Sequence, residues 1–158
     1  MASDSVLVDK CLRFSVRMVK LYKYLTEEQK EYILSKQLLR SATSIGANSN
    51  EAVYAASRND FINKMHIALK ETAETEYWLK LIAASEYIDK KLGDSLLYDC
   101  IEIKKICLLQ YQKQQKQTAK KRIIDRDNIL RFSQGRKSTF IIHSYLFYII
   151  YLSEVVII

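Results

Sequence analysis

Apolar residues recur at four- and three-residue steps over residues 5–25, the spacing of one face of a packed helix. This first row consists of Leu7, Cys11, Phe14, Met18, Leu21 and Leu25. A second apolar row lies about 120° around the same helix. Its members are Val8, Leu12, Val16, Val19 and Tyr22. One buried row is enough for a helix of a monomeric bundle, so the second row predicts contact with another subunit.

Three later segments also have helical patterns. Thr26, followed by two glutamates, indicates the start of a helix over about residues 27–56, with Gly46 as a candidate position for a bend. Ser57 followed by Asp60 is typical of a helix cap and predicts a helix over about residues 58–88. After a predicted turn at 89–94, apolar periodicity predicts a fourth helix over about residues 95–117.

Composition agrees with an all-α fold. The chain has no proline and 3 glycines, so the residues that usually punctuate sheets and tight turns are scarce. We therefore predict an antiparallel four-helix bundle in up-down-up-down order over residues 1–117. Residues 118–158 form an atypical C-terminal extension, first basic and then apolar.

The apolar part of this extension, residues 140–158, is long enough for a membrane span, and Arg136 and Lys137 precede it. His143 and Glu154 within the run are unfavourable for such a span. Three interpretations stay open: a membrane anchor, an added packed or exchanged element, and an extension without a role.

The chain carries a net charge of +7, but the predicted bundle is only mildly basic, with 18 Lys and Arg against 15 Asp and Glu in residues 1–117. Binding to phosphates depends on the clustering of cations rather than on the total charge. One candidate cluster is a ridge on the first helix formed by Lys10, Arg13, Arg17 and Lys20. A second cluster near the end of the fourth helix consists of Lys113, Lys116, Lys120, Lys121 and Arg122. An ordinary solvated face is the alternative for the ridge.

Five polar residues stand within otherwise small or apolar helical stretches: Arg40, Asn48, Glu51, Glu71 and Glu74. A buried charge must be paired, so we expect these residues to form a structural polar network that fixes helix register within or between subunits. A ligand pocket lined by Arg40 and Glu74 is the alternative, and no spacing supports it.

No pattern of catalytic residues is present. A di-iron bundle needs two Glu-x-x-His pairs, but Asn63 stands three residues before His66, and Phe140 before His143. Cys11, Cys100 and Cys107 have no CxxC spacing and are expected to be small buried hydrophobes. We therefore expect no enzyme activity, no metal and no cofactor. The first residues lack a secretory signal, which favours the cytoplasm.

Residues 37–60 (QLLRSATSIGANSNEAVYAASRND) and 70–81 (KETAETEYWLKL) resemble one family. It comprises the four-helix-bundle proteins encoded in intervening sequences of bacterial 23S ribosomal RNA genes, and its relatives include the accessory variability protein of diversity-generating retroelements. The resemblance covers about residues 5–117. The matching residues are Arg40, Ser41, Ser44, Ile45, Asn48, Glu51, Ser57, Arg58, Phe61, Ala68, Glu71, Glu74, Tyr77 and Trp78.

This resemblance implies an elongated bundle that associates into a five-membered barrel. In the retroelement protein, a basic exterior binds nucleic acid and cooperates with a reverse transcriptase. We therefore expect a cytoplasmic, non-enzymatic homo-oligomer, a pentamer, that binds RNA or DNA. A structural scaffold for a partner such as a reverse transcriptase is the first alternative. A bundle that binds a small molecule or a metal is the second.

Overall fold

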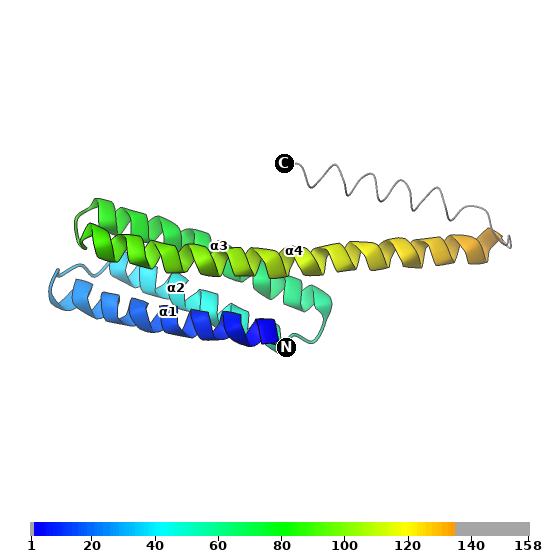
Figure 1. Cartoon of the computed structure of the whole chain (residues 1–158), viewed down its shortest axis with the longest axis horizontal. Helices are drawn as coiled ribbons and strands as arrows, with labels where there is room; N and C mark the ends of the chain where they lie inside the picture. Colours follow the sequence, from blue (N-terminus) through cyan, green and yellow to red (C-terminus); the bar gives the residue numbers. More distant parts are fainter. Residues whose placement is uncertain (1, 135–158) are drawn as a thin grey trace. The chain divides into compact units, whose positions relative to one another are not determined.

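The computed structural model describes residues 2–134 of the chain and the side chains of residues 6–129. Four α-helices and no strand are found in this part: α1 (Ala2–Glu27), α2 (Leu34–Val53), α3 (Arg58–Ala84) and α4 (Lys90–Gln134). The chain divides into two compact units, Met1–Thr118 and Ala119–Ile158. In the first unit, α1, α2, α3 and the first part of α4 form an antiparallel four-helix bundle (Figure 1). The predicted all-α bundle is confirmed.

The first apolar row of α1 faces the centre of this bundle, as predicted. Leu7, Phe14 and Leu25 are all almost completely buried, and the side chains between them on the row are buried too. They meet buried residues of the other three helices, among them Leu38 and Leu79. Burial of each large apolar side chain contributes about 1.5–3 kcal/mol. The core therefore lies along the axis of the bundle.

The predicted start of the second helix at Thr26 is wrong. The first helix continues to Glu27, and the Thr26 hydroxyl donates to the carbonyl oxygen of Tyr22, 2.9 Å away. Such a bond within a helix competes with the capping role that we expected of Thr26. After a connection over residues 28–33, α2 begins at Leu34.

Glu31 fixes the beginning of α2. Its carboxylate accepts hydrogen bonds from the backbone amides of Ile33, Leu34 and Ser35 at 2.9, 2.7 and 2.6 Å. Burial alone would raise the pKa of Glu31, but the amides of Leu34, Ser35 and Ile33 hold this pKa below its ordinary value. Glu31 thus satisfies the donors that a helix leaves free at its first turn.

The cap predicted for α3 is confirmed. The Ser57 hydroxyl accepts a hydrogen bond from the amide of Asp60, and the Asp60 carboxylate accepts one from the amide of Ala56, both at 3.1 Å. The helix ends at Ala84, before the predicted end at Ile88. It gives way to a connection in which Glu86 has a positive φ of 61°.

The predicted turn at 89–94 is wrong from its second residue onward, because α4 begins at Lys90. The Asp89 carboxylate accepts a hydrogen bond from the amide of Leu92 at 2.8 Å and supports this start. Gly93 is helical rather than part of a turn: a Cβ atom at this position would lie 3.2 Å from the Cβ of Ala83. The fourth helix also continues to Gln134, past its predicted end at 117.

No helix among residues 2–134 is long and apolar enough to cross a membrane. The apolar run 140–158, with its three interpretations, lies outside the described residues.

Candidate nucleic-acid interface

The cationic ridge of α1 is divided by ion pairs with α4. The Lys10 Nζ atom lies 2.8 Å from Oε2 of Glu102. Arg17 forms an ion pair with Asp99, and its Nη2 atom donates to the Ser95 hydroxyl at 2.9 Å. These two cations therefore hold α1 against α4, and their charges are compensated.

Arg13 and Lys20 are the other two members of the ridge, and both are exposed. Within the part of the chain that the structure describes, neither has a carboxylate within ion-pairing distance. They remain available to an anionic partner, whereas Lys10 and Arg17 would first have to leave their carboxylates. Half of the predicted ridge thus retains its full positive charge.

The pairing with Lys10 also shows in the acid–base behaviour of Glu102. Hydrogen bonds from Lys10 and then from Tyr98 lower the pKa of Glu102 below its ordinary value, and the same contact with Glu102 raises the pKa of Lys10. A shallow groove of about 210 Å³ runs beside this pair and is lined by both signs of charge, including Arg13 and Asp99. Mixed charge makes the groove itself a poor anion site.

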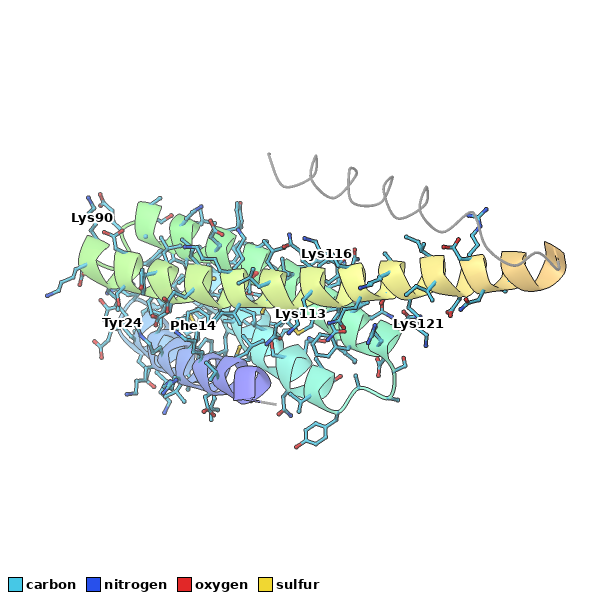
Figure 2. The ribbon with its side chains drawn as sticks, turned by 45° about the vertical axis from the view of Figure 1, so that its right-hand side comes forward. Phe14, Tyr24, Lys90, Lys113, Lys116 and Lys121 are labelled. Atoms are coloured by element: carbon cyan, nitrogen blue, oxygen red, sulfur yellow. The ribbon has the colours of Figure 1, made fainter. Side chains whose placement is uncertain are left out.

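The second cationic cluster is on α4. Lys113 and Lys116 belong to the first unit of the chain and are exposed (Figure 2). Lys120, Lys121 and Arg122 belong to the second unit, where they are exposed on the continuation of the helix. No ion pair involves any of these five among the described residues.

Three of the five predicted network residues link α2 to α3 by side-chain ion pairs. Arg40 Nη2 lies 2.6 Å from Oε1 of Glu74, and the same oxygen accepts a hydrogen bond from Trp78 Nε1 at 3.2 Å. Glu51 forms an ion pair with Lys64. With 61% of the Arg40 side chain exposed, the pair with Glu74 lies at the rim of the bundle rather than in its core.

The remaining two network residues act differently. Asn48 Nδ2 donates within α2, to the carbonyl oxygen of Ser44 at 2.9 Å. Glu71 Oε2 is buried and has no hydrogen-bond partner among the described residues. A bond that the sequence analysis missed, Thr75 Oγ1 to Ser41 Oγ at 3.0 Å, joins α2 and α3 inside the core. The only sequence signal for it is a hydroxyl residue at a core position of each helix.

The second apolar row of α1 is not covered by the described chain. Leu12, Val16 and Val19 are 63%, 49% and 41% exposed, and Val8 and Tyr22 are half-buried. Ser15, which lies between the buried row and the second row, is 3.5 Å from the position of a Cβ at Gly46, so the second row borders α2 rather than α4. None of its five members is charged.

The three cysteines are buried, which confirms their interpretation as small core residues. Desolvation raises the pKa of Cys11 to about 11 and those of Cys100 and Cys107 to about 12. Among the described residues, no group of three or more His, Cys, Asp or Glu side chains is arranged to hold a metal ion.

Comparisons with known proteins point to one family. The sequence profile of the family described as 23S rRNA-intervening sequence protein matches residues 3–108. A crystal structure of a protein of unknown function from the S23 ribosomal protein family of Bacteroides thetaiotaomicron is similar to this chain, with 54% identity and a TM-score of 0.69. The similarity covers 70% of this chain and 98% of that one. No curated protein matches this sequence.

Proposed function

Since this chain belongs to the family of 23S rRNA-intervening sequence proteins, we propose that it is a cytoplasmic, non-enzymatic homo-oligomer that binds RNA or DNA. Identical copies associate through the face shared by α1 and α2, and the ring that they form presents cations to phosphate groups. The observation that carries the proposal is the exposed, uncharged second row of α1.

Exposure of this row supports association. Leu12, Val16 and Val19 succeed one another along one side of α1, so their exposure is continuous rather than scattered. On the neighbouring surface of α2, Thr43, Ala47 and Asn50 are small or uncharged, and no ion pair has to be desolvated when another copy covers them. A second helix can therefore pack on this face.

A ring with five members follows from the resemblance to the family. Each copy contributes Arg13 and Lys20, both exposed, so that closure of the ring repeats this pair of charges around the assembly. Repetition turns a mildly basic bundle into an assembly with many phosphate contacts, which would make binding steeply dependent on salt.

The nucleic-acid part of the proposal is tested with the double variant Arg13→Glu/Lys20→Glu. Binding of a labelled single-stranded RNA should weaken by at least about tenfold at low salt, because two phosphate contacts per copy become repulsive. The matched control is Lys30→Glu/Lys90→Glu, which makes the same change in net charge at two exposed lysines outside the ridge and outside the α1–α2 face. Equal affinity of the two double variants would show that the ridge has no local role.

The scaffold alternative is favoured by one observation. Glu102 and Asp99 compensate two of the four ridge cations, which is the arrangement of an inter-helix brace rather than of a phosphate site. Under this alternative the oligomer holds a protein partner such as a reverse transcriptase and makes no nucleic-acid contact itself. Retention of RNA by the purified protein alone, lost at high salt, would reject it.

A further inference from the structure

An exposed ridge without acidic residues follows the outer side of α3. Its members recur at four- and three-residue steps, and every one is exposed: Asn59, Asn63, His66, Lys70, Ala73 and Tyr77. Side chains that donate hydrogen bonds, stack or carry positive charge make up most of this ridge. The charge pattern of the sequence does not identify this ridge, because Lys70 is its single lysine.

The adjacent row of α4 is also free of acidic residues over positions 101–116. Its exposed residues in this range are Ile101, Lys105, Leu108, Gln112, Gln115 and Lys116. The two helices are joined side by side through this surface, since the rings of His66 and Tyr111 lie 5.5 Å apart with an interplanar angle of 35°. Gln115 Nε2 donates to the Tyr111 hydroxyl at 2.5 Å and orients that ring.

Charge on this α3–α4 face is positive after its ion pairs are counted. On α3, the acidic residue on the side toward α4 is Glu76. Its carboxylate forms ion pairs with Lys80 at 2.5 Å and with Lys104 of α4 at 2.9 Å. Those two contacts hold the pKa of Glu76 below its ordinary value. Lys70 and Lys116 have no ion pair among the described residues, so their charges are left for a partner.

We propose that the α3–α4 face binds single-stranded nucleic acid, with an unpaired base stacked on the His66–Tyr111 pair and phosphates on Lys70 and Lys116. The inference rests on the proposed function and specifies its ligand. The two rings are tilted by 35° to each other, so the exposed His66 ring supplies the stacking face and the half-buried Tyr111 ring supports it from α4. Any base can stack on such a face irrespective of sequence. Lys70 stands one helical turn from His66, so that a phosphate beside the stacked base lies within reach.

Several features favour a single strand over other ligands. In a duplex the base faces are covered by neighbouring bases, and the His66 ring would find no partner. An acidic protein would use the lysines but would leave the stacking pair and the amides of Asn63 and Gln112 without a specific role. Amide groups of this kind can donate to and accept from base edges.

The experiment compares His66→Ala and Lys70→Glu/Lys116→Glu with the unchanged full-length protein. Fluorescence anisotropy measures binding of labelled oligo(U), oligo(dT) and a fully paired blunt-ended duplex. We expect His66→Ala to weaken both single strands by about tenfold, the effect of one lost base–aromatic stack, and to leave the duplex unaffected. The lysine double variant should reduce the salt slope by about 0.7 for each lost phosphate contact. Lys30→Glu/Lys90→Glu is again the control for net charge.

His66 is exposed, and its replacement should leave the helical content and the midpoint of thermal unfolding unchanged, which is checked by circular dichroism. If His66→Ala binds the single strands as tightly as the unchanged protein, the stacking site is refuted while nucleic-acid binding stands. If no probe binds even at low salt, the proposed function fails together with this inference.

Discussion

Lys10 Nζ lies 2.8 Å from Oε2 of Glu102, a contact that joins the first helix of the bundle to the last across 92 residues of sequence. Because both side chains remain partly exposed, the pair is screened by water and adds little to stability. Its larger effect is on charge, since it removes one cation from the ridge that the sequence presents on α1.

Replacement of Glu102 by Gln should release Lys10 from this pair. If the ridge binds phosphate, E102Q increases the affinity for labelled RNA and steepens its salt dependence, because one more free cation is available per copy. Asp94→Asn is the control, since it removes an exposed negative charge of α4 that forms no ion pair with the ridge. An equal gain in both variants would attribute the effect to total charge rather than to Lys10.

Glu31→Gln should destabilise the bundle by about 1–2 kcal/mol, the usual effect of losing a helix cap. Three backbone amides of the first turn of α2 lose their carboxylate acceptor in this variant. Urea unfolding at neutral pH measures the difference. Replacement of the exposed Glu28, which lies in the same connection, serves as the control and should have little effect.

The same carboxylate predicts a dependence of stability on pH. The pKa of Glu31 is lower in the folded chain than its ordinary value of 4.5, so the folded state binds the proton less readily than the unfolded state. Its contribution is therefore fully present above about pH 5 and is lost as the pH falls below 4.5 toward the folded pKa. The free energy of unfolding of E31Q should lack this part of the dependence on pH. If the difference in unfolding free energy between E31Q and the unchanged protein stays constant from pH 7 to pH 3, the assignment is contradicted.

Gly46→Ala should stabilise the protein by up to about 1 kcal/mol. The added Cβ would lie 3.5 Å from Cys11 Cβ and from Ser15 Oγ, which is ordinary contact distance, and α2 is helical through this position. Thermal unfolding checks the direction. Gly93→Ala is the comparison: its Cβ would lie only 3.2 Å from Ala83 Cβ, so we expect less gain or a loss. A destabilised G46A would show that α1 and α2 approach each other more closely here.

All three thiols should be inert in the folded protein. The pKa of Cys11 is raised to about 11 and that of Cys107 to about 12, so almost no thiolate exists at pH 8, and both side chains are buried. A thiol reagent should modify the native protein slowly and all three cysteines rapidly after addition of denaturant. Rapid modification of the native protein would contradict the packing of this core.

The bundle could be predicted because a helix with one buried face leaves a strong periodic signal. The first row of α1, from Leu7 to Leu25, is of this kind, and so is the Ser57–Asp60 cap, whose two bonds are local. Helix ends were predicted less well where the deciding contact was subtle. Glu31 looks like a surface glutamate in the sequence, and the role of Gly93 depends on the approach of Ala83 from another helix.

The candidate site was harder to predict for the same reason. Charges at three- and four-residue steps identify a ridge on one helix, but they do not show that Asp99 and Glu102 face it from another helix. The juxtaposition of His66 and Tyr111 is likewise invisible in the sequence, since 44 residues separate them and no local pattern links them. Sites shared between helices require the packing to be known.

The mass of the protein in solution tests the central claim most directly. Sedimentation or light scattering at micromolar concentration should give a multiple of the mass of the 18.5 kDa chain, and five copies if the ring is closed as proposed. Leu12→Glu should dissociate this assembly. Ile33→Glu, which changes another exposed apolar residue, should leave it intact. A monodisperse 18.5 kDa species for the unchanged protein would contradict the claim that the second row of α1 packs against another copy.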